Sequence, residues 1–251
     1  MLKKLSAVIR LNIRLQLTDP ASTLILTAIP LIFIPFMSPA FKSMLVADGY
    51  ADATGVEQAV PSMAVLFSFL SVQIIINSFI NERMWGTWPR LAASATPRGA
   101  VLTGKALVAY LLQFVQVLAV LVLGALAFGY RPKGSVIALL LAVLAFSAVL
   151  AALGVAIALW APSQDLALSL SNIIGMLAAG IGGAFCTVSS LPDWAQHAAR
   201  FSPAYWAIDA IHSVSLDGAG VAGVLPAVGV LSLFFAGLAA LAMLRFAVKK
   251  D

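Results

Sequence analysis

The sequence predicts an all-α polytopic membrane protein with six transmembrane helices, an N-terminal interfacial helix and two short outer-leaflet helices before the last span. Hydrophobic residues make up 62% of the 251 residues and charged residues only 10%, whereas soluble domains average about 45–50% and about 25%. Six apolar runs are long enough to cross a hydrocarbon core of about 30 Å. The segments between them are too short to bury a core of their own, so residues 1–251 form a single membrane domain.

Residues 2–18 are expected to form an amphipathic helix in the plane of the membrane interface. Apolar and basic side chains separate onto opposite faces at helical spacing, with Leu2, Leu5, Ile9 and Ile13 on one face and Lys3, Arg10 and Arg14 on the other. A cleaved signal peptide also begins with basic residues, but Arg10 and Arg14 interrupt the apolar core that such a peptide needs. The interfacial helix is therefore the better interpretation.

The first span, about residues 21–41, follows a helix start signal at Asp19-Pro20. It contains three prolines, and each removes a backbone donor. We therefore expect its outer half to kink or unwind around Pro30, Pro35 and Pro39. Residues 42–59 then form an acidic outer loop.

Amide side chains mark the second span, about residues 60–80, and the fifth span, about residues 166–188. Gln73 and Asn77 lie four residues apart and share one helix face, and Asn172 lies in the fifth span. Such amides rarely face lipid. They either line a substrate pathway or join helices, and the sequence leaves both interpretations equally open.

The fifth span also carries small residues at four-residue spacing, namely Gly175, Ala179 and Gly183. Such a series lets another helix approach closely, either within one protomer or between two. The third, fourth and last spans, residues 101–128, 136–160 and 221–247, complete the set of six.

Residues 190–220 fit neither a full span nor an ordinary loop. Ser202-Pro203 starts a helix over residues 203–216, which is too short to cross a bilayer. A second short helix precedes it, and we expect both to lie on or dip into the outer leaflet. Asp209 and His212 share a face of the later helix, but a pair without further ligands predicts no metal site.

The longest polar interruption runs from residue 81 to residue 105 and holds four of the fifteen Lys and Arg residues. Lys and Arg near span ends resist translocation, so the loop at residues 81–100 is expected in the cytoplasm. Eleven of the fifteen then fall on that side, which places both termini there as well. A soluble protein inside the cell is the expected partner of this loop.

Catalytic chemistry is not predicted for the chain itself. Residues 99–106 nearly match a phosphate-binding loop, but Ala106 has no hydroxyl for the magnesium ion. Metalloprotease and serine-hydrolase motifs are missing as well. The cations lie at span ends rather than in a stripe with aromatic residues, so no nucleic acid partner is expected. We therefore predict no catalytic residue, metal or cofactor in the chain.

Short motifs lie in the central loop and before the last span, namely Glu82-Arg83, Gly86-Thr87, Leu91, Thr96-Pro97 and Gly104-Lys105 in the loop, and Phe201-Ser202-Pro203 with Tyr205 and Asp209 before the last span. Together they resemble the corresponding segments of type-2 ABC exporter permeases, the group that includes drug-resistance, polysaccharide and nodulation-factor exporters. The resemblance extends over nearly the whole chain.

The resemblance implies that the loop contains a coupling helix, which docks into a cytoplasmic ATPase through Glu82, Arg83, Gly86, Thr87 and Leu91. Pro89 leaves the start of that helix open. Two permease copies, expected as a homodimer, would form the pathway with two ATPases that bind ATP and magnesium. The first, second and fifth spans would line the route.

The implied function is export of an amphipathic small molecule or drug across the cell membrane. Export of a lipid or lipid-linked polysaccharide is the alternative within transport, and it would favour a lateral opening near an unwound first span. A membrane scaffold or sensor that transports nothing is the alternative from another class.

Overall fold

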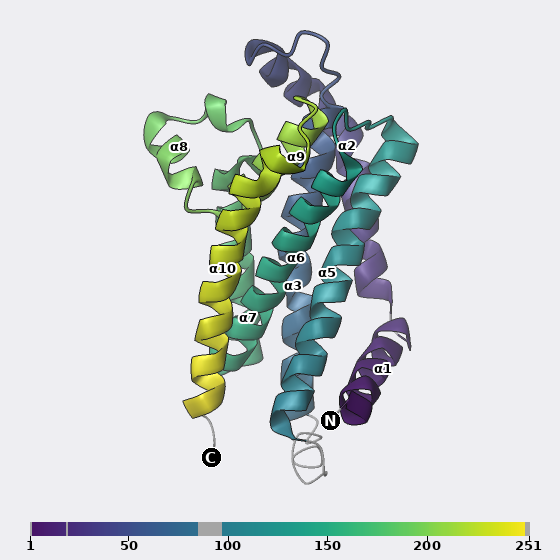
Figure 1. Cartoon of the computed structure of the whole chain (residues 1–251), viewed down its shortest axis with the longest axis vertical. Helices are drawn as coiled ribbons and strands as arrows, with labels where there is room; N and C mark the ends of the chain where they lie inside the picture. The colour runs from purple at the N-terminus through teal and green to yellow at the C-terminus, as the bar shows by residue number, and fades with distance from the viewer. Residues whose placement is uncertain (1, 19, 85–96, 249–251) are drawn as a thin grey trace.

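The computed structural model describes residues 2–18, 20–84 and 97–248, and Figure 1 shows these residues folded into helices. Six of the described helices are long and apolar enough to cross a membrane, which confirms the predicted fold class. The elements are α1 (Leu2–Thr18), α2 (Ala21–Ala47), α3 (Val56–Met84), α5 (Arg98–Phe128), α6 (Val136–Trp160), α7 (Gln164–Ala179), η1 (Gly180–Ala184), η2 (Val188–Ser190), α8 (Asp193–Ala199), α9 (Pro203–Ser215) and α10 (Val221–Val248).

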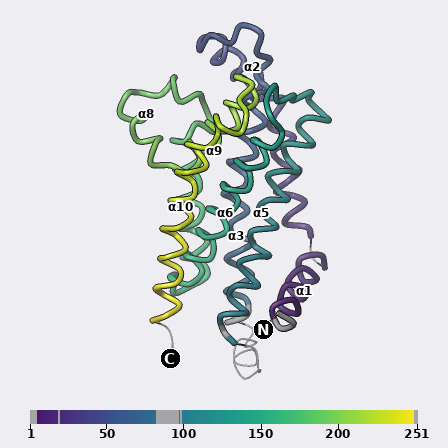
Figure 2. Tube along the Cα trace, in the orientation of Figure 1, coloured from purple at the N-terminus to yellow at the C-terminus, as the bar shows by residue number. Residues whose placement is uncertain are grey.

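The long helices lie side by side along the long axis of the molecule, with α3 and α6 in the middle (Figures 1 and 2). Every residue of α6 from 149 to 159 is buried, as expected of a helix that is apolar on all sides. By contrast, α2 and α10 bury only four residues each. The two chain ends lie at the same end of the bundle, while α8 and α9 lie at the other end.

The outer helices present many large apolar side chains on the outside of the bundle. Examples are Leu24, Phe36, Val115, Leu126, Leu177 and Leu233. Exposure to water would cost about 25 cal/mol for each Å² of such surface, and contiguous apolar patches of this extent are rare on soluble monomers. A bilayer removes that cost, so the surface is that of a multi-pass membrane protein.

The three prolines of the first span do not unwind it. Of the two outcomes that the sequence predicted, an unwound outer half was wrong, and a kink stays a prediction. α2 continues as one helix through Pro30, Pro35 and Pro39 to Ala47. Each proline frees one carbonyl, but the intervening backbone bonds persist. Gln116 of α5 also places its Nε2 3.5 Å from the carbonyl of Leu26, the group that Pro30 leaves without its helical donor.

The fifth span is helical over a shorter stretch at its outer end than the predicted limit of residue 188. α7 gives way to the π-helical turn η1, in which Gly183 has φ +99°, a left-handed conformation that favours glycine. The side chain of Gln58 in α3 holds this turn, because its Nε2 donates to the carbonyl of Gly183 at 3.0 Å. The chain then leaves the bundle axis through η2 and α8.

The two short helices predicted between residues 190 and 220 are present as α8 and α9. Ser202 caps α9, since its Oγ accepts from the Ala204 backbone N–H at 3.2 Å and donates to the Ala178 carbonyl at 2.7 Å. Pro203 occupies the first helical turn. α9 packs against α3, α6, α10 and η1, so it closes one end of the bundle. Its depth relative to a bilayer stays a prediction.

The connection between α5 and α6 is held against the end of α9. Tyr130 is buried, and its hydroxyl lies 2.5 Å from Ser215 Oγ. The backbone N–H of Gly134 donates to the carbonyl of Val214 at 2.8 Å. Burial raises the pKa of Tyr130 to about 12, so this hydroxyl stays protonated at neutral pH.

Candidate functional site

Two amide pairs join α3 to α7 within the membrane-spanning part of the bundle. Gln73 Nε2 donates to Asn172 Oδ1. One helical turn further along α3, Asn77 Oδ1 accepts from Gln164 Nε2 at 3.0 Å. All four side chains are half-buried. The structure therefore brings together the three amides that the sequence singled out, and adds a fourth.

Gln164 was missed as a member of this group, because the sequence placed it in a short loop. It is instead the first residue of α7. The spacing between Gln164 and Asn172 could have identified it. Eight residues is close to two helical turns, so both amides lie near one face of the helix. The pairs act as interhelical hydrogen bonds in this conformation, and a role in a substrate pathway stays a prediction.

A second polar layer joins α3 to α5 and was also missed. Gln113 and Gln116, both buried, project from α5. Ser71 Oγ donates to Gln113 Oε1 at 2.8 Å, and Gln113 Nε2 lies 3.3 Å from the carbonyl of Ser68. Two glutamines at i, i+3 in an otherwise apolar run were the available signal. α3 thus carries polar contacts on two faces, one toward α7 and one toward α5.

Two of the three small residues of the fifth span lie at contacts inside the protomer. A side chain on Gly175 would place its Cβ 3.1 Å from Phe69 Cβ in α3, and Ala179 is fully buried. Gly183 does not continue this face, because it lies in η1. Its neighbour Gly182 makes the close approach instead: a Cβ there would lie 2.6 Å from Ala204 Cβ in α9.

The predicted coupling residues fall at the end of α3 and beyond it. Glu82 and Arg83 belong to the last turn of α3, while Gly86, Thr87 and Leu91 lie outside the described residues. Helix extends into both ends of the loop expected at residues 81–100, because α3 runs to Met84 and α5 begins at Arg98. The contact of these residues with an ATPase stays a prediction.

The ends of α3 and α5 near this loop are fixed to each other. Lys105 of α5 is buried, and its Nζ donates to the carbonyl of Ser78 at 2.6 Å. The same Nζ lies 4.9 Å from the centre of the Phe79 ring, a cation–π distance. α1 packs beside them, since Gly104 leaves room for Val8. α5 therefore packs against both α1 and α3 where the loop begins and ends.

Comparison with known proteins identifies the family. The family model described as ABC-2 type transporter matches residues 3–216. One relative is the linearmycin resistance permease protein LnrN of Bacillus subtilis (strain 168), which is 23% identical over 186 residues. That alignment covers 74% of this chain and 48% of the relative, so the chain spans just under half of the relative's length. With six apolar helices and a family match over most of its length, the chain belongs to the ABC-2 type transporter family.

Proposed function

We propose that this chain is the permease subunit of an ATP-binding cassette exporter, in which two copies form the substrate pathway and separate soluble ATPases drive it. The family match over residues 3–216 carries the proposal. The similarity to LnrN, a linearmycin resistance permease protein, supports transport. In this assembly ATP and magnesium would bind to the ATPase rather than to this chain.

The arrangement of α3 and α5 supports coupling through the segment between them. Both helices end near the two chain ends (Figure 1), and Lys105 joins them through the Ser78 carbonyl. A force applied to the connecting segment would therefore move α3 and α5 together. Because α3 also bonds α7 through Gln73 and Asn77, that movement would reach the amide pairs.

The half-buried amides between α3 and α7 support a place beside the pathway. Polar groups in a membrane face other helices or water rather than lipid, and these four keep part of their surface exposed in a single copy of the chain. A second copy packed against this side would enclose them. α2, α3 and α7 would then line the route.

An amphipathic small molecule or drug is the proposed substrate. Export of a lipid or lipid-linked polysaccharide stays the alternative within transport; the lateral opening that it would favour at an unwound first span has no counterpart in α2, which is one helix to Ala47. Substrate-stimulated ATP hydrolysis by the reconstituted complex would distinguish an exporter from a scaffold or sensor that transports nothing.

Glu82→Lys tests the coupling step. If Glu82 pairs with a cation of the ATPase in a partly desolvated contact, its loss costs roughly 2–5 kcal/mol, whereas an exposed pair contributes only about 0–1 kcal/mol. We expect Glu82→Lys to insert normally, but to lower transport, stimulated ATP hydrolysis and ATPase co-purification together. Glu82→Ala should show a smaller loss.

Asp193→Lys is the matched control, because it makes the same charge reversal on an exposed residue of α8 at the far end of the bundle. It should leave co-purification and hydrolysis unchanged. If Glu82→Lys keeps native ATPase co-purification and native stimulated hydrolysis, coupling does not pass through Glu82.

A further inference from the structure

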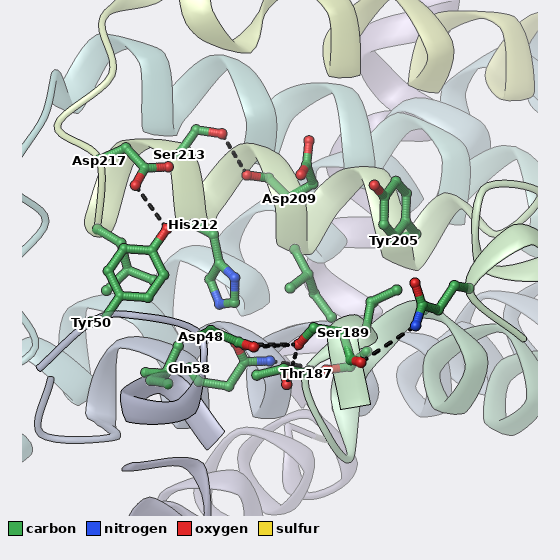
Figure 3. A pocket seen from close by; sticks show the side chains of 17 residues that line it. Asp48, Tyr50, Gln58, Thr187, Ser189, Tyr205, Asp209, His212, Ser213 and Asp217 are labelled. Carbon is green, nitrogen blue, oxygen red and sulfur yellow. Dashed lines mark hydrogen bonds between the residues drawn. The ribbon is translucent and has the colours of Figure 1, made fainter. Parts of the chain in front are cut away.

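The end of the bundle opposite the two termini contains a cavity of about 520 Å³. Figure 3 shows that it lies between α9 on one side and the connections that follow α2 and η1 on the other. Sites for small molecules have volumes of about 300–1,000 Å³. The cavity is thus large enough for an organic ligand, and it is separate from the amide pairs between α3 and α7.

The charges around the cavity are negative. Asp48, Asp209 and Asp217 contribute to its lining, and no lining residue in the described part of the chain is Lys or Arg. The Asp48 carboxylate accepts from Ser189 Oγ at 2.7 and 2.8 Å, and Asp217 accepts from the Tyr50 hydroxyl at 2.9 Å. Both donors are neutral, so these hydrogen bonds bring no cation to the two carboxylates, which belong to exposed residues. In Figure 3 the Asp209 side chain points away from His212, and it lies at the edge of the cavity.

Two buried polar atoms of the cavity wall have no hydrogen-bond partner among the residues that the structure describes. One is Oε1 of Gln58, a residue only 1% exposed. The amide orientation is fixed, because Gln58 Nε2 donates to Gly183 O and Ser62 Oγ, each at 3.0 Å. Oε1 is therefore an acceptor that lacks a donor, which is unfavourable in a buried position.

The second such atom is Nε2 of His212. The imidazole projects from α9 toward Asp48 and Gln58 (Figure 3). Burial lowers the pKa of His212 to about 4, although Asp217 and Asp48 act in the opposite direction. The ring is neutral at pH 7, so one of its two nitrogens is an acceptor and the other a donor. It supplies no positive charge to balance the carboxylates.

We propose that this cavity binds an organic cation with N–H donors, such as an amine or a guanidinium compound. Its charged group would lie near Asp48 and Asp217, and its N–H groups would face the part of the cavity wall formed by Gln58 and His212. Leu45, Ile208 and Leu216 of the lining would contact its hydrocarbon part. A metal ion fits less well, since no three His, Cys, Asp or Glu side chains in the described ranges are placed to hold one. The site goes beyond the proposed function and needs no ATPase.

Titration calorimetry on the purified chain in phosphatidylcholine nanodiscs tests this proposal. The probes are 2-phenylethylamine and 2-phenylethanol, which share one skeleton but differ in charge and in the number of donors. Empty nanodiscs correct for partition into lipid. We expect saturable binding of the amine, with the alcohol weaker by at least about tenfold. Equal binding of the two, or no saturable binding of the amine, would overturn the proposal.

Variants locate the site. Asp217→Asn and Asp48→Asn keep the side-chain shape and remove one charge each, so each should weaken amine binding by about three- to fivefold, as expected for an exposed carboxylate. Asp52→Asn is the matched control: it lies in the same connection, is exposed and is not part of the lining, and its affinity should stay within about twofold of native. A thermal unfolding scan shows which variants are folded. Native affinity in both folded lining variants would place the amine elsewhere.

Discussion

At the scale of single residues, side chains that the sequence marks as polar become informative through their partners. Gln73, Asn77 and Asn172 were selected because amides are costly in lipid, and each is hydrogen-bonded between α3 and α7. Gln113 and Gln116 obey the same physical rule and were passed over. Which partner each amide finds depends on helix rotation and packing, and this is why spacing within one helix could not identify it.

Asn77→Leu tests the role of the amide pairs. The change removes the acceptor of Gln164 Nε2, and interhelical bonds of this kind contribute about 0.6 kcal/mol on average and at most about 1.7 kcal/mol in membranes. We therefore expect near-normal protein yield, together with an altered preference among exported compounds. The measurement is transport of several substrates, normalised to the amount of protein in the membrane.

Ser232→Leu serves as the comparison, because Ser232 is exposed on α10 and bonds only within its own helix. A uniform loss of yield for Asn77→Leu would mean that the amides only join helices. Unchanged transport of every substrate at normal yield would exclude both roles.

At the scale of the elements, the spans were predicted closely, but their ends and their contacts were not. Periodicity and length identify an apolar helix, whereas the residue at which it ends depends on local backbone hydrogen bonds and dihedral angles. α2 extends to Ala47 because its freed carbonyls do not break the remaining bonds, and α7 ends in η1 because Gly183 adopts φ +99°. Gly175 and Ala179 lie at contacts inside the protomer, and the contact beyond them is made by Gly182 rather than Gly183.

Gly182→Ala tests the contact between η1 and α9. The added Cβ would lie 2.6 Å from Ala204 Cβ and 2.7 Å from the Tyr205 backbone N, so one element must shift. Overpacking of this kind costs typically about 1–3 kcal/mol, and we expect a lower thermal unfolding midpoint. Ala179→Leu, at a fully buried position, should act in the same direction.

Gly229→Ala is the paired control, since a Cβ at Gly229 in α10 meets nothing within 4 Å. That change should leave the midpoint unchanged or raise it slightly. Equal midpoints for Gly182→Ala and Gly229→Ala would show that the close approach is not maintained in the membrane.

At the scale of the whole molecule, the charge distribution predicts the orientation in the membrane. A cysteine at Asp52 or Arg131 should react with an impermeant thiol reagent added outside intact cells, and one at Ser94 should react only after permeabilisation. Asp52 and Arg131 are both exposed. Gly134 is a poor choice, because a Cβ there would lie 2.4 Å from the Ala219 carbonyl oxygen.

The labelling is done in a Cys186→Ala background, since Cys186 is the one native cysteine. The Cys186→Ala protein without an added cysteine gives the level of non-specific labelling. Labelling of Ser94→Cys in intact cells would show that the orientation is the reverse of the predicted one. Residue 94 would then lie outside the cell, where the loop could not contact a cytoplasmic ATPase.

The sequence alone determined that the chain is a six-span helical membrane protein with short helices before the last span, because hydropathy, length and helix start signals act locally along the chain. The tertiary structure decided which polar groups meet, such as Gln73 with Asn172 and Ser71 with Gln113. It also formed the acidic cavity from segments as distant as Asp48 and Asp217. Such contacts depend on the relative rotation and depth of several helices, and no window of neighbouring residues contains that information.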